Sequence, residues 1–139
     1  MVISGINHLT FAVSDLEVSL DFYSNLLGLA AEVKWNNGAY LSGPGIWLCL
    51  TKGRPNPDQD YSHVAFSVES EQFTALQEKI VAAGFGTWQE NTSEGDSLYF
   101  LDPDNHKLEI HCGNLSQRLD SLKQKPYAGL KWLNSTDSD

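Results

Sequence analysis

Alternating hydrophobic and polar residues occur in two similar stretches of the chain. Residues 7–13 read Asn-His-Leu-Thr-Phe-Ala-Val, and residues 62–68 read Ser-His-Val-Ala-Phe-Ser-Val. In both stretches every second residue is apolar, which is typical of a β-strand with one buried face. His8 corresponds to His63 and Val13 to Val68, an offset of 55 residues in each case. The chain therefore contains an internal repeat that begins with a strand.

Each of these strands leads into a stretch with helical spacing. In the first copy either Ser14 or Asp15 is the N-cap and Gly28 ends the helix; in the second copy Ser70 is the N-cap and Gly84 ends it. Apolar residues recur three or four positions apart along both helices: Leu16, Leu20, Tyr23 and Leu27 in the first, and Phe73, Leu76 and Ile80 in the second.

The later parts of the two copies also correspond. Residues 39–41 (Ala-Tyr-Leu) match residues 98–100 (Leu-Tyr-Phe), and Pro44 matches Pro103, an offset of 59 residues. Each copy is therefore predicted to be a βαβββ unit of an α+β domain, about residues 4–52 and 62–112, joined by a linker at 53–61. A C-terminal segment at 113–139 follows. In it we expect a helix at 115–124 capped by Asn114, and a frayed polar tail from residue 134 onward.

Strand alternation places several polar side chains on the sheet faces that the helices do not cover. His8, His63 and Glu109 all point to that side, because their neighbours in sequence form the apolar faces. Two histidines and a carboxylate can bind a divalent transition metal and leave coordination positions open. The alternative is two unrelated strand histidines and a surface glutamate. The equivalent places of the two histidines in the repeat favour the metal interpretation.

Other chemically able residues have more than one interpretation. His106 lies in a turn of residues 102–105 and is expected to be structural. His111 shares a face with Glu109, so it is either a neighbour that supports the ligand or an ordinary strand residue. Cys49 occupies the repeat position of Glu109, and we expect it to be a small buried residue that lines the cavity rather than a metal ligand.

Composition narrows the function further. Lys plus Arg number 9 and Asp plus Glu number 18, so the net formal charge is −9. That charge disfavours a nucleic-acid-binding or anionic-membrane-binding module. No apolar run approaches the roughly 18 residues of a membrane span, and no signal peptide is apparent. Two cysteines are too few for a disulfide framework, so we expect free thiols and a cytoplasmic protein.

Several motifs are similar to those of fosfomycin-modifying glutathione transferases. They include Asn-His-Leu-Thr at 7–10, Trp-Leu-Cys-Leu at 47–50, Ser-Glu-Gly-Asp-Ser at 93–97 and Leu-Asp-Pro-Asp at 101–104. The resemblance covers nearly the whole chain, and the loop at 93–97 is its most specific part. These are manganese enzymes of the vicinal oxygen chelate superfamily. The resemblance therefore implies a glyoxalase/bleomycin-resistance/dioxygenase-like fold and a domain-swapped homodimer with shared active sites.

The resemblance also implies roles for individual residues. His8, His63 and Glu109 resemble the manganese ligands, and Thr10 resembles the catalytic residue that hydrogen-bonds the oxirane oxygen. Further residues resemble a potassium loop (Ser93, Glu94, Gly95 and Ser97), the phosphonate-binding residues (Tyr99 and Arg118) and the cavity lining (Tyr40, Trp47 and Tyr61). Without the resemblance, the loop is a plain polar turn, Arg118 a solvated helix residue and the aromatic residues part of a core.

The chain departs from the family pattern at three positions. Gln89 stands where the family usually has Lys, Thr92 where it often has Arg, and Val64 where it has Tyr. Loss of the Lys removes a cation from the phosphonate pocket and is expected to weaken substrate binding. The expected function is Mn²⁺-dependent addition of glutathione to fosfomycin, with K⁺ as an activator. The alternatives are another enzyme of the superfamily, such as an epoxide hydrolase or a glyoxalase, and a metal-free drug-binding resistance protein.

Overall fold

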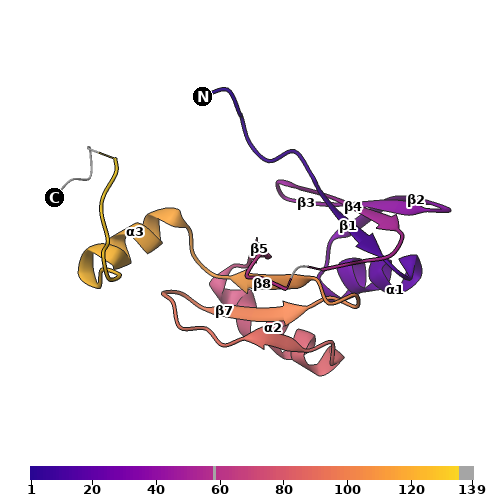
Figure 1. Ribbon diagram of the computed structural model, residues 1–139. Coiled ribbons are helices and arrows are strands. Elements are labelled where there is room, and N and C mark those ends of the chain that lie inside the picture. Colours follow the sequence, from indigo (N-terminus) through magenta and orange to yellow (C-terminus); the bar gives the residue numbers. More distant parts are fainter. Residues whose placement is uncertain (58, 135–139) are drawn as a thin grey trace.

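Two βαβββ units follow one another along the chain, as the repeat predicts (Figure 1). The computed structural model describes residues 1–57 and 59–134. The first unit contains β1 (Leu9–Val13), α1 (Leu16–Asp21), a π-helical continuation η1 (Phe22–Leu26), β2 (Ala30–Trp35), β3 (Gly38–Gly43) and β4 (Ile46–Lys52). The second unit contains β5 (Val64–Ser67), α2 (Ser70–Ala83), β6 (Thr87–Gln89), β7 (Ser97–Leu101) and β8 (Lys107–His111). Helix α3 (Leu115–Gln124) completes the α+β fold.

Each unit forms its own four-stranded sheet. The strand orders are β1-β4-β3-β2 and β5-β8-β7-β6, so the first strand of each unit pairs in parallel with the last. Within these parallel pairs Thr10 lies opposite Cys49, and Ala65 lies opposite Glu109. Cys49 and Glu109 therefore occupy equivalent places in the two sheets, as the sequence offsets predict.

Local capping chemistry sets the helix ends. The Asp15 carboxylate accepts a hydrogen bond from the Val18 backbone N–H at 3.2 Å, which makes Asp15 rather than Ser14 the N-cap of α1. The predicted cap at Ser70 is wrong by one residue. Glu69 is the N-cap, because its carbonyl already accepts the hydrogen bond from the Gln72 N–H at 3.0 Å.

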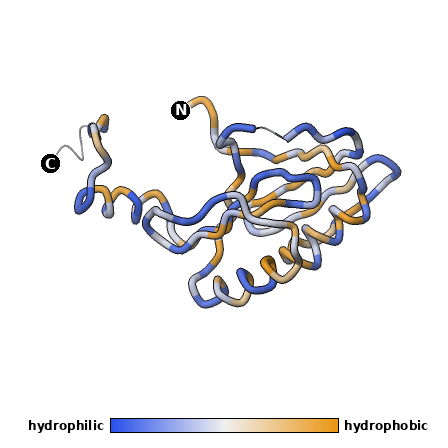
Figure 2. Tube along the Cα trace, turned by 60° about the horizontal axis from the view of Figure 1, so that its bottom comes forward, coloured by the Kyte–Doolittle hydropathy of each residue, from blue (hydrophilic) through white to orange (hydrophobic). Residues whose placement is uncertain are grey.

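The C-terminal helix α3 has the predicted bounds and the predicted cap. Asn114 and Gln117 form a capping box in which each side chain bonds the other residue's backbone N–H. Helix α3 and the segment after it project away from both sheets (Figures 1 and 2). Of the tail expected to be frayed, residues 135–139 lie outside the described part of the chain. None of the described helices is long and apolar enough to cross a membrane.

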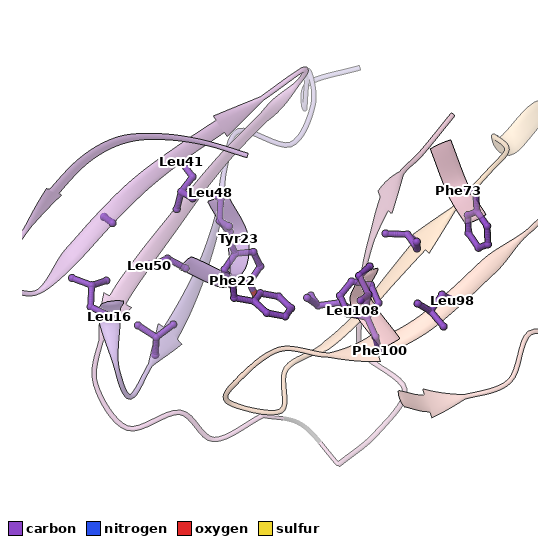
Figure 3. Packing of buried hydrophobic residues seen from close by; sticks show 14 residues of the cluster. Leu16, Phe22, Tyr23, Leu41, Leu48, Leu50, Phe73, Leu98, Phe100 and Leu108 are labelled. Atoms are coloured by element: carbon purple, nitrogen blue, oxygen red, sulfur yellow. The ribbon is translucent and has the colours of Figure 1, made fainter. Parts of the chain in front are cut away.

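One hydrophobic core joins the two units. The inward strand faces pack beneath the helices, and their buried residues form a single cluster. Phe22 lies at the junction and points toward Phe100 of the second unit (Figure 3). Its ring centroid is 5.2 Å from that of Phe85 and 6.4 Å from that of Phe100. Because the apolar face of each sheet is buried in this core, the opposite face of each sheet is available for other contacts.

A buried polar bridge also links the units. The Tyr23 hydroxyl donates to Asp102 Oδ2 at 2.6 Å, while Asp102 Oδ1 accepts the His106 backbone N–H at 2.9 Å. The His106 ring Nε2 lies 2.7 Å from the Ala12 carbonyl oxygen on β1. Burial, followed by the nearby Asp102 charge, raises the pKa of Tyr23, and burial raises the pKa of Asp102. His106 is therefore structural, as its position in the turn predicts.

Candidate metal and substrate site

The second sheet brings two of the three predicted metal ligands together. His63 Nε2 lies 2.9 Å from Glu109 Oε1. His63 Nδ1 lies 2.8 Å from the Tyr61 carbonyl oxygen, and a carbonyl can only accept, so Nδ1 carries a proton. Nε2 and Oε1 thus converge on one point. Adjacent ligands of an octahedral ion, each about 2.1 Å from the metal, lie about 3.0 Å apart, so this pair fits a divalent cation.

The other oxygen of Glu109 is held from behind. The Ser97 hydroxyl donates to Oε2 at 2.7 Å, and His111 Nδ1 lies 2.6 Å from the same hydroxyl oxygen. The glutamate is only 7% exposed. A buried carboxylate oriented on one oxygen presents its second oxygen in a fixed direction, which is what a metal ligand requires.

The first sheet carries the third predicted ligand. His8 is exposed immediately before β1, and its Nδ1 lies 2.7 Å from the Asn7 side-chain oxygen. That acceptor places the proton on Nδ1 and leaves the Nε2 lone pair for a ligand. The His8 ring packs on the Trp47 ring with a centroid distance of 4.6 Å. The Trp47 ring in turn packs on Tyr40, with the two centroids 5.5 Å apart. Thr10 is exposed on β1, two residues after His8, and lies opposite the buried Cys49 of β4.

One chain does not bring the complete ligand set together. Among residues 1–57 and 59–134, no three histidine, cysteine or carboxylate side chains lie close enough to hold a metal ion. His8 belongs to the first sheet, while His63 and Glu109 belong to the second. A site that contains all three residues therefore needs the open face of one first-unit sheet to lie against the open face of a second-unit sheet.

Aromatic rings surround His63 on the second sheet. Tyr61, Trp88 and Tyr99 have ring centroids 5.1, 5.2 and 6.1 Å from the imidazole. The Gln89 side-chain amide donates to the Tyr61 hydroxyl at 2.6 Å, so Gln89 also lies at this edge of the site. Trp88 and Gln89 both contact Tyr61, although they are neighbours in sequence, because the register of strand β6 shifts between residues 87 and 89. Trp88 is a site residue that the sequence analysis did not single out.

The loop at 93–97 and Arg118 lie together. The Arg118 guanidinium donates to Glu94 Oε2 and to the Glu94 carbonyl oxygen, both at 3.2 Å, and to the Ser93 hydroxyl at 3.3 Å. Burial acts to lower the pKa of Arg118, but its hydrogen bond to Glu94 holds that pKa above the ordinary value. Gly95 has a φ of 82°, and a Cβ there would lie 2.6 Å from the Cys112 carbonyl oxygen, so the loop requires glycine.

Comparison with known proteins agrees with this fold and this arrangement of residues. Residues 5–110 match the model of the Glyoxalase/Bleomycin resistance protein/Dioxygenase superfamily. The chain is 46% identical over 134 residues to the glutathione transferase FosA of Serratia marcescens, which covers 93% of this chain and 95% of that one. The chain belongs to the fosfomycin resistance branch of this superfamily.

Two further relatives of the fosfomycin resistance branch are similar over most of the chain. The metallothiol transferase FosB of Lysinibacillus sphaericus is 39% identical over 132 residues, covering 90% of this chain and 94% of that one. A crystal structure of a mutant of FosX from Listeria monocytogenes, complexed with Mn(II) and 1S,2S-dihydroxypropylphosphonic acid, has a TM-score of 0.79 and 33% identity. The match covers 86% of this chain and 98% of FosX.

Proposed function

We propose that this protein is a metal-dependent transferase that adds glutathione to the epoxide of fosfomycin and thereby inactivates the antibiotic. The observation that carries the proposal is the convergence of His63 Nε2 and Glu109 Oε1, 2.9 Å apart, on an open sheet face. The 46% identity to a glutathione transferase over 93% of the chain supports glutathione as the thiol. The reaction joins the thiol sulfur to an epoxide carbon, breaks the carbon–oxygen bond and leaves a hydroxyl on the product.

The proposed metal is Mn²⁺, held by His8, His63 and Glu109. Imidazole nitrogen and carboxylate oxygen suit this ion, and a FosX structure described with Mn(II) supports the choice. Such an ion supplies a Lewis acid that polarises the epoxide carbon–oxygen bond. His8 and His63 present their Nε2 atoms because an oxygen acceptor holds the Nδ1 proton of each ring.

We propose that two chains build each site as a homodimer, with His8 from one chain and His63 and Glu109 from the other. His8 on the first sheet and the His63–Glu109 pair on the second both lie on open sheet faces. Large apolar side chains are also exposed on the first sheet, with Trp35 45% and Trp47 41% exposed. The apolar N-terminal residues before His8 also extend away from the fold (Figures 1 and 2). Exposed apolar surface of this extent is typical of a protein interface. A second chain would cover it and complete the ligand set.

The other site residues have defined tasks in this proposal. The Thr10 hydroxyl donates a hydrogen bond to the epoxide oxygen as negative charge develops on it, which lowers the barrier most when the donor is already in place. Arg118 and Tyr99 bind the phosphonate, and Tyr40, Trp47 and Tyr61 line the cavity. The loop of Ser93, Glu94, Gly95 and Ser97 binds, through its carbonyl oxygens, a K⁺ ion that activates the enzyme, while the Ser97 hydroxyl stays with Glu109. A reduced thiol as co-substrate favours a cytoplasmic location, as do the two free cysteines.

Epoxide hydrolysis is the second candidate reaction. The phosphonate in the FosX structure carries two hydroxyl groups, which is what addition of water to the epoxide yields. Gln89, beside Tyr61 at the edge of the site, stands where the resemblance expects Lys, and this altered pocket favours a second reaction on the same epoxide. The two reactions differ only in the nucleophile, so they are distinguished by their products.

A ³¹P NMR assay separates the candidates. Purified protein with Mn²⁺ and K⁺ is incubated with fosfomycin alone, with glutathione and with cysteine. We expect a new phosphonate signal only with thiol, larger with glutathione, and none in the Glu109→Ala protein. Diol formation without thiol would establish the hydrolase instead. No conversion under any condition would refute both reactions and leave a drug-binding protein as the remaining interpretation.

A further inference from the structure

His111 lies two residues beyond Glu109 on β8 and ends a short chain of hydrogen bonds that leads to this carboxylate. His111 Nδ1 is 2.6 Å from the Ser97 hydroxyl oxygen, and that hydroxyl is 2.7 Å from Glu109 Oε2. His111 Nδ1 and Glu109 Oε2 are themselves 3.6 Å apart, too far for a good direct hydrogen bond. The serine hydroxyl therefore mediates between the two side chains.

The direction of the chain follows from the number of protons. A serine hydroxyl has one proton, and an ionised carboxylate can only accept, so the Ser97 proton is donated to Glu109. The oxygen of Ser97 must then accept from His111, whose Nδ1 carries the donated proton. His111 Nδ1 only donates, Glu109 Oε2 only accepts, and the Ser97 hydroxyl does both; the imidazole N–H fixes the serine oxygen so that its proton points at Oε2.

The backbone around His111 holds the ring in this orientation. Ser97 and His111 are direct partners in the β7–β8 register. A Cβ on Gly95 would lie 2.9 Å from the His111 Cε1 atom, and one on Gly113 would lie 2.9 Å from its Nε2 atom. Both glycines have positive φ, 82° and 135°. The imidazole thus fits a slot between two glycine backbones, and the slot leaves no room for a side chain on either.

We infer that His111 is a positioning residue that, through Ser97, holds Glu109 in the orientation needed to bind the metal ion. The hydrogen-bond chain fixes Oε2, so that Oε1 remains beside His63 Nε2. This inference rests on the proposed metal set, but not on the identity of the substrate. Removal of such an outer partner typically lowers metal affinity about 10- to 100-fold.

Three substitutions of His111 test the donor at Nδ1 rather than the volume of the ring. Asparagine places an amide N–H near the Nδ1 position, whereas glutamine places it one bond further away and leucine provides none. We expect His111→Asn to bind Mn²⁺ within about threefold of the wild type, and His111→Leu and His111→Gln to bind about 10- to 100-fold more weakly. The readout is the EPR signal of free Mn²⁺ during titration, with thermal melting of the metal-free proteins to confirm folding.

Ser97→Ala completes a double-mutant cycle. If the two residues act in one chain, Ser97→Ala alone weakens Mn²⁺ binding as much as His111→Leu does, and the double variant is no weaker than either. Additive losses, or wild-type affinity in His111→Leu, would overturn the inference. Because the readout is metal binding, a protein that binds Mn²⁺ normally but leaves fosfomycin unchanged would refute the proposed function and not this one. Absence of Mn²⁺ binding in the wild type would overturn the inference.

Discussion

Replacement of Tyr23 by Phe removes one hydroxyl from the bridge between the two units. Tyr23 is fully buried, and its hydroxyl donates at 2.6 Å to Asp102, which is 1% exposed. The ring stays, so no cavity forms. A hydrogen bond to a charged group contributes about 1.5–3 kcal/mol, so we expect the free energy of unfolding to fall by about 2 kcal/mol. That is a large share of the roughly 5–15 kcal/mol of a typical domain.

Urea unfolding at pH 7 and a fixed protein concentration measures this loss. Thr74→Val is the control, because it removes an exposed hydroxyl on α2, away from the open sheet faces, and we expect a change below about 0.5 kcal/mol. A Tyr23→Phe protein as stable as this control would refute the bridge as a stabilising contact. Asp102→Ala should cost more, because it also leaves the Asp104 and His106 backbone N–H groups without their acceptor.

The contribution of the Tyr23 hydroxyl to the free energy of unfolding depends on pH. Burial and the Asp102 charge raise the pKa of Tyr23 in the folded protein, whereas an unfolded tyrosine loses its proton near pH 10. The folded state therefore binds more protons above that pH, and the contribution to stability, complete below pH 10, declines as the pH rises. The stability difference between wild type and Tyr23→Phe should narrow from pH 9 to pH 11. A constant difference over this range would contradict the assignment.

Three further predictions concern the site. Glu109→Gln keeps the shape but removes the ligand charge, so Mn²⁺ affinity should fall by more than the about 10- to 100-fold that is typical when a partner of a ligand is removed. The exposed Glu90→Gln control should bind Mn²⁺ normally, and wild-type affinity in Glu109→Gln would disprove Glu109 as a ligand. Exchange of Na⁺ for K⁺ at constant ionic strength should raise the rate of fosfomycin modification, and equal rates would make the loop at 93–97 an ordinary turn. Gln89→Lys should lower the KM for fosfomycin, because a cation near a phosphonate contributes mainly binding; an unchanged or higher KM would indicate another substrate or another cation in place.

The fold was predictable because its signals are local. Alternation at 7–13 and 62–68 gives the first strand of each unit, and Gly84 ends α2 with the positive φ that favours glycine. The offset of the repeat then places Cys49 and Glu109 in equivalent strands. The Ser70 cap was wrong although serine is the better capping residue, because the backbone fixes the first turn: the Glu69 carbonyl accepts the Gln72 N–H and no side chain caps α2.

The site was only partly predictable because its contacts cross between strands. Alternation put His63 and Glu109 on one face, and the structure brings them to 2.9 Å. Trp88 was not predicted, because the irregular register of the short strand β6 between residues 87 and 89 is not visible in the sequence. The connection of His111 to Ser97 depends on the β7–β8 register, and the Tyr23–Asp102 bond joins residues 79 positions apart. No local pattern in the sequence encodes such pairings.

Complementation between two inactive chains tests the shared metal site and its activity most directly. His8→Ala and Glu109→Ala chains, each with a different affinity tag, are co-expressed, and the heterodimer is isolated by both tags and assayed for fosfomycin modification. In the heterodimer one site carries both lesions and the other carries neither. We expect each homodimer to be nearly inactive and the heterodimer to regain about half the parental activity, given independent sites. An isolated heterodimer without activity, or a wild-type protein that is a monomer by light scattering, would contradict the account.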